Sequence, residues 1–166
     1  RTLKVGDQVL EDAGDGELWR HARLRWLDST IGLDDEVFPP YTPVSVASQD
    51  LAVLGRAVRL ADTGLFSSIT SCFTRNVDGI DAAPQELLAE PMRLVVQPEG
   101  GPPVIWQGGG PKTLAQAPGA VSWEATSTAH AMELQCRAKL ECDGYVNFRL
   151  TLTSRQAARL GDVRLE

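Results

Sequence analysis

Strict alternation of apolar and polar residues near the C-terminal end constrains the fold of this chain more than any other feature. In one run the apolar side chains share a parity, at Met132, Leu134, Cys136, Ala138, Leu140 and Cys142. A second run alternates in the same way, at Val146, Phe148, Leu150 and Leu152. Successive side chains of a strand point to opposite faces, so both runs predict strands with one buried face. Asp143-Gly144 between them favours a tight turn, and the sequence therefore predicts a β-hairpin.

Shorter alternating stretches predict further strands, separated by turns rich in glycine and proline. They lie at residues 3–10, 43–47, 51–54, 57–60, 67–73, 92–97, 104–107, 120–127 and 163–165. Helical signals are scarce: residues 84–89 permit one short turn, and residues 17–27 fit a strand or a helix equally well. The pattern predicts an all-β fold, an antiparallel, supersandwich-like β-sandwich of about ten strands with at most one or two short helices.

Length and composition narrow the classes of protein. A chain of 166 residues fits a single β-sandwich domain, and because it starts with Arg1 and ends on strand-like alternation, we expect it to be excised from a larger multidomain protein. A net charge of −6 argues against nucleic acid as a partner, since phosphate binding depends on clustered Lys and Arg. We expect no membrane span, because no apolar run approaches about 18 residues. We expect no cofactor.

Residues 26–43, WLDSTIGLDDEVFPPYTP, form the stretch richest in functional side chains. It is far longer than the usual connection of about 4–6 residues within a domain. Long connections with such chemistry are typical of contact surfaces. We expect contacts with another domain or with glycan from Trp26, Asp28, Asp34, Asp35, Glu36 and Tyr41.

The acids of this segment also permit two other interpretations. If residues 34–36 are extended, Asp34 and Glu36 project to one side with their Cα atoms roughly 6 to 7 Å apart, near the spacing of glycosidase carboxylate pairs. Catalysis would further require that one carboxyl be desolvated, which the sequence does not guarantee. Calcium is a second candidate, but the ligand rhythm of a calcium loop is absent after Asp28. A solvated or interface role is the preferred interpretation, and we assign no metal site.

The remaining reactive side chains favour structural roles. Cys136 and Cys142 lie on the inward parity of a strand, and three cysteines, with Cys72, cannot all pair. The two histidines, His21 and His130, support no Ser-His-Asp or Cys-His arrangement. The stretch GGGPKT at residues 108–113 has proline where a phosphate-binding loop requires glycine, which favours a hairpin connection.

Tryptophans are the other residues that could indicate ligand binding, because exposed indole rings stack on flat sugar faces. Trp123 shares its parity with Val121 and Ala125, which predicts a place in the core. Trp106 flanks a glycine-rich loop, and we name it as a candidate carbohydrate contact, although burial against a neighbour is the default for it and for Trp26.

Several segments carry a resemblance to a known family. In order along the chain they are RLRWLDSTIGLDDEVFPPYTPV, LGRAVRLADTGLFSSITSCF, ELLAEPMRLVV, GAVSWEA, and ECDGYVNFRLTLT with DVRLE. Together they resemble the N-terminal β-sandwich part of large bacterial proteins related to glycoside hydrolase family 123. The resemblance covers most of the chain from about Leu24 onward.

This resemblance implies a multidomain enzyme that is extracellular, periplasmic or on the cell surface, in which β-sandwiches flank a (β/α)8 barrel acting on N-acetylated galactosamine-type glycans. The family's catalytic Asp-Glu pair belongs to the barrel, and no segment here matches it, so no catalytic residue is carried over. The leading hypothesis is an accessory sandwich that braces the barrel domain of the same polypeptide. The alternatives are a free-standing carbohydrate-binding module and a self-contained glycosidase that uses Asp34 and Glu36.

Overall fold

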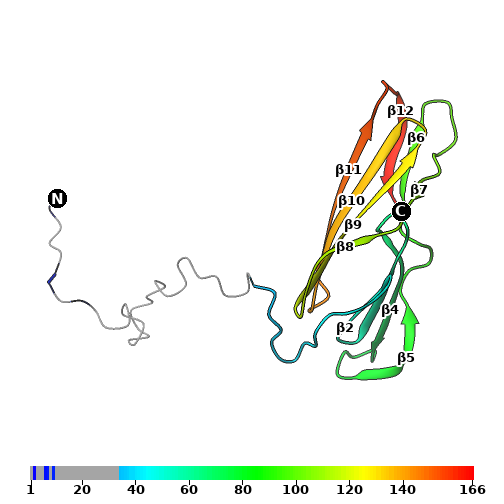
Figure 1. Ribbon diagram of the computed structural model, residues 1–166. Coiled ribbons are helices and arrows are strands. Elements are labelled where there is room, and N and C mark those ends of the chain that lie inside the picture. Colours follow the sequence, from blue (N-terminus) through cyan, green and yellow to red (C-terminus); the bar gives the residue numbers. More distant parts are fainter. Residues whose placement is uncertain (1, 3–5, 8, 10–33) are drawn as a thin grey trace. The chain divides into compact units, whose positions relative to one another are not determined.

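The computed structural model describes residues 2, 6, 7, 9 and 34–166 of the chain, and leaves the side chains of residues 81 and 82 undescribed. By its contacts the chain divides into two compact units, Arg1–Asp34 and Asp35–Glu166, and all strands described below belong to the second (Figure 1). The strand predicted at residues 3–10 falls mostly outside the described residues, and the segment at residues 17–27 falls wholly outside them.

The described part of the chain is all-β, as predicted, and its residues form twelve antiparallel strands and no helix. In chain order the strands are β1 (Ser45–Ala47), β2 (Asp50–Val53), β3 (Arg56–Leu60), β4 (Phe66–Phe73), β5 (Ile80–Glu86), β6 (Leu94–Pro98), β7 (Gln107–Gly108), β8 (Lys112–Ala117), β9 (Ala120–Ala129), β10 (Met132–Glu141), β11 (Val146–Ser154) and β12 (Leu160–Leu165).

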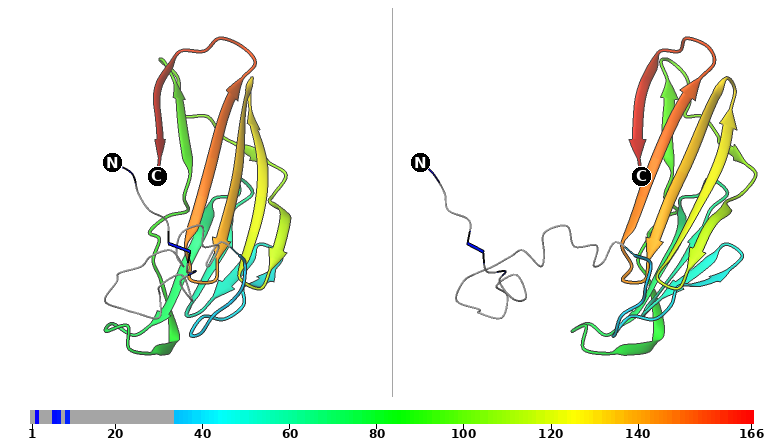
Figure 2. Two further views of the ribbon diagram at one scale, coloured as in Figure 1. Left: turned by 90° about the vertical axis from the view of Figure 1, so that its left-hand side faces the viewer. Right: turned by 60° about the vertical axis from the view of Figure 1, so that its left-hand side comes forward.

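These strands form three sheets, and the one that contains the longest strands, β9, β10 and β11, is called the long sheet. The long sheet has the order β11-β10-β9-β7, and β8 also pairs with β9. A five-stranded meander, β1-β2-β3-β4-β5, and a two-stranded ribbon, β12-β6, form the other sheets. Figure 2 shows β6 and β12 in a layer separate from β9, β10 and β11, as expected for a sandwich.

The predicted hairpin is confirmed and forms the spine of the long sheet. β10 and β11 pair over nine residues, from Met132↔Ser154 to Leu140↔Val146, and Gly144 takes a positive φ of 89° in the turn. The even-numbered positions of β10 are all buried, as the alternation predicts. Burial of this face fixes the register, because a shift of one residue would turn the apolar set to solvent.

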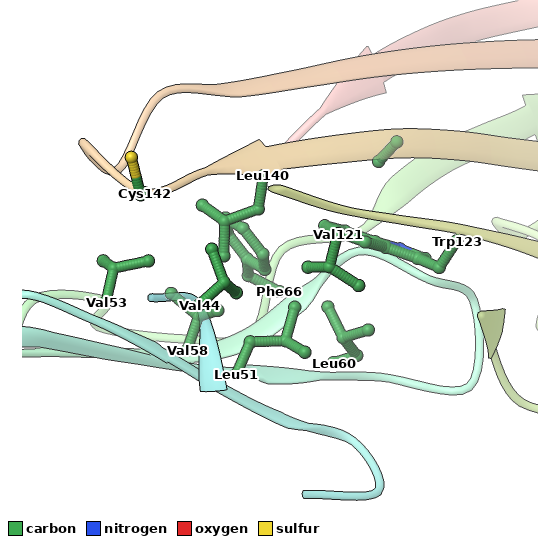
Figure 3. Packing of buried hydrophobic residues seen from close by; sticks show 11 residues of the cluster. Val44, Leu51, Val53, Val58, Leu60, Phe66, Val121, Trp123, Leu140 and Cys142 are labelled. Carbon is green, nitrogen blue, oxygen red and sulfur yellow. The ribbon is translucent and has the colours of Figure 1, made fainter. Parts of the chain in front are cut away.

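The core lies between the long sheet and the meander. Figure 3 shows Leu140 and Cys142 facing Leu51, Val53 and Val58 across this space. Trp123 of β9, buried as predicted, fills its centre: its ring contacts Phe66 and Phe148 at centroid distances of 6.3 and 6.1 Å. Its indole N–H donates to the carbonyl oxygen of Gly64 at 2.8 Å, so this large side chain is buried with its polar group satisfied.

The structure differs from the sequence analysis at exposed edge segments. Residues 84–86, where the sequence permits a short helical turn, end strand β5, and the Glu86 carboxylate accepts hydrogen bonds from the Ser68 hydroxyl and the Ile69 amide. These two bonds, with that from Ser68 the stronger influence, lower the pKa of Glu86. The strand expected at residues 104–107 is reduced to β7. β8 was missed because it is exposed over nearly its whole length and so shows no alternation of burial.

We predict that Gly64 tolerates alanine poorly for reasons of packing. A Cβ atom at Gly64, which has a φ of 81°, would lie 2.9 Å from the Cβ of Ala125 and 3.2 Å from the sulfur of Cys136. Gly100 has a similar φ of 71° but open space around it, so Gly100→Ala is the matched control for backbone strain alone. Urea unfolding should show Gly64→Ala costing about 1–3 kcal/mol more than Gly100→Ala. Equal costs would contradict this packing.

We predict that the reactivity of each cysteine decreases with the burial of its thiol. The described cysteines are all unpaired; Cys136 and Cys142 are buried and Cys72 is partly exposed. Burial raises the pKa of the Cys136 thiol to about 11, and only the thiolate is nucleophilic. Iodoacetamide at pH 8 should therefore label Cys72 first, and Cys136 only after urea unfolds the chain. Mass spectrometry of the peptides would refute this if Cys136 reacted as fast as Cys72 in the native protein.

Candidate functional site

The residues singled out from the sequence separate into three groups. Trp26 and Asp28 lie outside the described residues. Asp34, Asp35 and Glu36 are exposed, and Tyr41 is partly buried. Trp106 is partly buried beside β6, to which its indole N–H is bonded. Their contacts are with different elements, so the described candidates form two sites and not one.

The backbone of Asp35 and Glu36 packs directly on the turn between β8 and β9. The Gly119 amide donates to the carbonyl oxygen of Asp35 at 2.8 Å, and a Cβ atom at Gly119 would lie only 2.4 Å from that oxygen and 2.7 Å from the carbonyl oxygen of Glu36. Glycine is required here by close backbone approach. The acidic segment, residues 34–36, is therefore held against the turn between β8 and β9.

Lys139 of β10 provides a second anchor for the acidic segment. Its ammonium lies 2.7 Å from a carboxylate oxygen of Asp35 and 3.2 Å from one of Glu141. The pKa of Lys139 is raised, chiefly by its hydrogen bond to Asp35. Because both partners are about two-fifths exposed, this pair contributes modestly to stability. The carboxylate of Asp35 is thus engaged within the domain.

Tyr41 has a packing role at the end of the same segment. Its ring packs against the core and meets the exposed ring of Phe38 edge-on, with centroids 5.3 Å apart. Its amide donates to the carbonyl oxygen of Phe38 at 3.0 Å, which closes a turn. This arrangement leaves Phe38 as the outward-facing ring of the pair.

The proposed acid pair, Asp34 and Glu36, has exposed side chains. A general acid that works near neutral pH needs a carboxyl shielded from water. No structural feature of the described residues therefore favours a catalytic role for this pair, and that role stays a prediction.

Trp106 lines a second candidate site, a hollow of about 430 Å³ formed by the β6–β12 ribbon, the loop before β7 and the turn between β3 and β4. This volume is within the range of about 300–1,000 Å³ for small-molecule sites. Its apolar wall comes from the ribbon and from the loop before β7, through Met92, Val95, Val104 and Ile105. The indole N–H of Trp106 donates to the carbonyl oxygen of Leu94 at 2.8 Å, which fixes the orientation of the ring.

A network of ion pairs forms the polar rim of this hollow. The guanidinium groups of Arg93 and Arg164 both contact the Glu166 carboxylate, at 2.7 and 2.6 Å. Hydrogen bonds from Arg93 and then Arg164 lower the pKa of Glu166. Arg164 also pairs with Asp162, and Arg93 with Glu90 at 3.8 Å. The rim itself therefore consists of Arg93, Arg164 and Glu166, and Glu90 and Asp162 pair with the two arginines without lining the hollow.

The sequence points to Trp106 but gives no sign of the rim residues Arg93, Arg164 and Glu166. Arg93 and Glu166 are 73 positions apart, and only the pairing of β6 with β12 brings them together. Alternation along residues 92–97 places Arg93 on one face of a strand, but no pattern in the sequence identifies its partner strand. A second hollow, of about 660 Å³, lies beside Pro98, Pro103, Thr128 and His130, and was also not foreseen.

Metal-binding clusters and membrane-spanning helices are both absent from the described residues. The described residues contain no group of three or more His, Cys, Asp or Glu side chains placed to hold a metal ion. No helix among them has the length and apolar character needed to span a membrane.

We predict that Gly119→Ala detaches the acidic segment from the sandwich. The added methyl group would collide with backbone atoms of Asp35 and Glu36, which cannot move aside as a flexible side chain would. Hydrogen exchange of the Gly119 amide, protected in the native chain by the carbonyl oxygen of Asp35, should accelerate. Gly161→Ala is the control, since a Cβ atom there makes only ordinary contacts at 3.7 Å. Unchanged protection at residue 119 would contradict the contact.

Comparison with known proteins gives one family. The family model described as glycoside hydrolase 123, third domain, matches residues 44–166. Searches of curated proteins and of solved structures find no match. The family resemblance is confirmed, and the matching model describes a third domain where the resemblance pointed to the N-terminal part. Because the match covers well over half of the chain, this protein belongs to the glycoside hydrolase 123 third-domain family.

Proposed function

We propose that this chain is a non-catalytic accessory β-sandwich that braces the separate (β/α)8 barrel of a glycoside hydrolase. The observation that carries the proposal is the match of residues 44–166 to a domain described as the third in its family. A third domain implies neighbouring domains in the same polypeptide. We also propose that the parent protein is exported or on the cell surface, on the strength of the sequence resemblance.

An apolar strip on β12 supports docking of another domain. Leu160, Val163 and Leu165 are 40%, 48% and 52% exposed. Val163 pairs with Val96 and Leu165 with Leu94, so these side chains share a face with Val96, which is fully buried. The face that is buried at β6 is thus uncovered at β12.

β11, the end strand of the long sheet, also carries apolar side chains. Leu150 and Leu152 of β11 are partly buried and pair with the buried Cys136 and Leu134 of β10, so they point inward. Both β11 and β12 are end strands of their sheets. Apolar side chains on an uncovered strand are typical of interfaces, and contacts between domains combine such strips with polar surroundings. We therefore assign the strip on β12 to the barrel of the same polypeptide.

The test compares full-length protein with and without charge on the strip. Val163→Lys combined with Leu165→Lys should separate the unfolding of the sandwich from that of the barrel, so that calorimetry shows two transitions where the native protein shows one. Leu114→Lys on β8, at a residue 52% exposed, is the matched control and should leave a single transition. A single transition in the double variant, with unchanged Tm, would contradict docking through this strip.

The two alternatives make different demands of the isolated chain. A self-contained glycosidase would hydrolyse aryl glycosides and lose that activity in Asp34→Asn or Glu36→Gln. A free-standing carbohydrate-binding module would bind sugar, while charge on β12 would leave the unfolding of the parent protein unchanged. Either result would replace the bracing role.

A further inference from the structure

We propose that the hollow beside Trp106 is a binding site for a neutral glycan, a function separate from bracing. Val95 and Arg164, which share one face of the β6–β12 ribbon, line the hollow, whereas the proposed docking strip lies on the face of Val96 and Val163. Both faces belong to the same two strands, but alternate residues serve them. The two functions can therefore be disrupted independently.

The first element of the site is a flat ring held in a fixed orientation. Trp106 is tied to β6 by its indole N–H, which donates to the Leu94 carbonyl oxygen at 2.8 Å. The loop that carries it is tied to the same strand by the Val104 amide, which donates to the carbonyl oxygen of Val96 at 2.9 Å. A ring that is immobile before binding loses little entropy when a ligand stacks on it. The apolar C–H face of a sugar ring fits such a surface.

The second element is a rim whose arginines are already paired. Arg93 and Arg164 line the hollow with Glu166, which both contact, and each arginine has a further carboxylate partner, Glu90 for Arg93 and Asp162 for Arg164. An anionic ligand would have to compete with carboxylates already paired to both guanidinium groups, and a cationic ligand would have to displace the arginines. The rim therefore favours a neutral ligand over a charged one.

The rim nevertheless keeps hydrogen-bonding capacity for hydroxyl groups. Each guanidinium has five N–H donors, more than its carboxylate contacts use, and each carboxylate oxygen accepts more than one hydrogen bond. Bonds to ionised partners are about twice as strong as neutral ones, and they are directional. Neighbouring donors and acceptors suit adjacent sugar hydroxyls, which both donate and accept. An apolar wall with a few convergent polar groups is the usual composition of a small-molecule site.

Ile105 extends this surface toward the second hollow. It is 83% exposed, and together with Pro103 and Val104 it lines both hollows. The loop thus forms a ridge between two depressions, of about 430 and 660 Å³. A chain of linked sugar rings can cross such a ridge, whereas a single ring occupies only one side. We therefore expect oligosaccharides to bind more tightly than monosaccharides.

The test is a titration of the whole chain with neutral oligosaccharides, N-acetylated and not, and with sulfated and sialylated ones, followed by NMR. Trp123 is an internal control, because its indole N–H is buried and bonded to Gly64. Neutral glycan should shift the indole signal of Trp106 and leave that of Trp123 in place. Saturable binding confined to charged glycans, or no neutral glycan binding at about 10 mM, would overturn the proposal.

Three variants would test the location of the site. Trp106→Ala should weaken binding by about tenfold or more, equal to about 1.4 kcal/mol. Tyr145→Ala removes an exposed aromatic ring in the β10–β11 turn and should leave affinity unchanged. Trp106→Phe keeps a ring while losing the bond to Leu94, and should retain part of the affinity even if Trp106→Ala fails to fold. Equal affinity of native protein and Trp106→Phe, with Tyr145→Ala weakened, would place the site elsewhere.

Discussion

Burial of one face of the β9–β10–β11 sheet is the constraint on which the rest of this structure depends. Every second side chain of β9 and β10 is buried, and the positions between them are mostly exposed or partly exposed. Trp123 is the largest fully buried side chain on this face, and the bond from its indole to Gly64 ties β9 to the turn before β4. A core of this size requires a covering layer, which the meander provides through Leu51, Val58 and Phe66.

Close backbone approach at two glycines shows how little space this packing leaves. Gly64 lies against Ala125 and Cys136 of the long sheet, and Gly119 lies against the backbone of Asp35 and Glu36. The first contact brings the two layers together, and the second holds the acidic segment. The described part of the segment that the sequence marked as a contact surface is therefore anchored at Asp35, by its backbone and by its pair with Lys139, with Phe38 and Glu36 left exposed.

The surfaces proposed for docking and for glycan binding both lie on the β6–β12 ribbon. This ribbon has only two strands. On the face of Val96, the side chains of Val163 and Leu165 are about half exposed. On the face of Val95 and Arg164, the ribbon helps to line the hollow beside Trp106. An accessory domain needs such surfaces in addition to a stable core, and a sandwich can supply them without disturbing the strands beneath. The proposed docking and the proposed glycan contact are therefore compatible on one small domain.

The sequence by itself determined the all-β class, the β10–β11 hairpin with its inward face, and the buried position of Trp123, because alternation over ten residues has one consistent solution when one face must be buried. It did not determine β8 or β5, since exposed edge strands carry no alternation of burial. It named Trp106 but gave no sign of Arg93, Arg164 and Glu166 beside it, nor of Gly119 beneath Asp35. Only tertiary structure decided those contacts, because they join positions far apart in the chain whose meeting depends on which strands pair and how the layers stack.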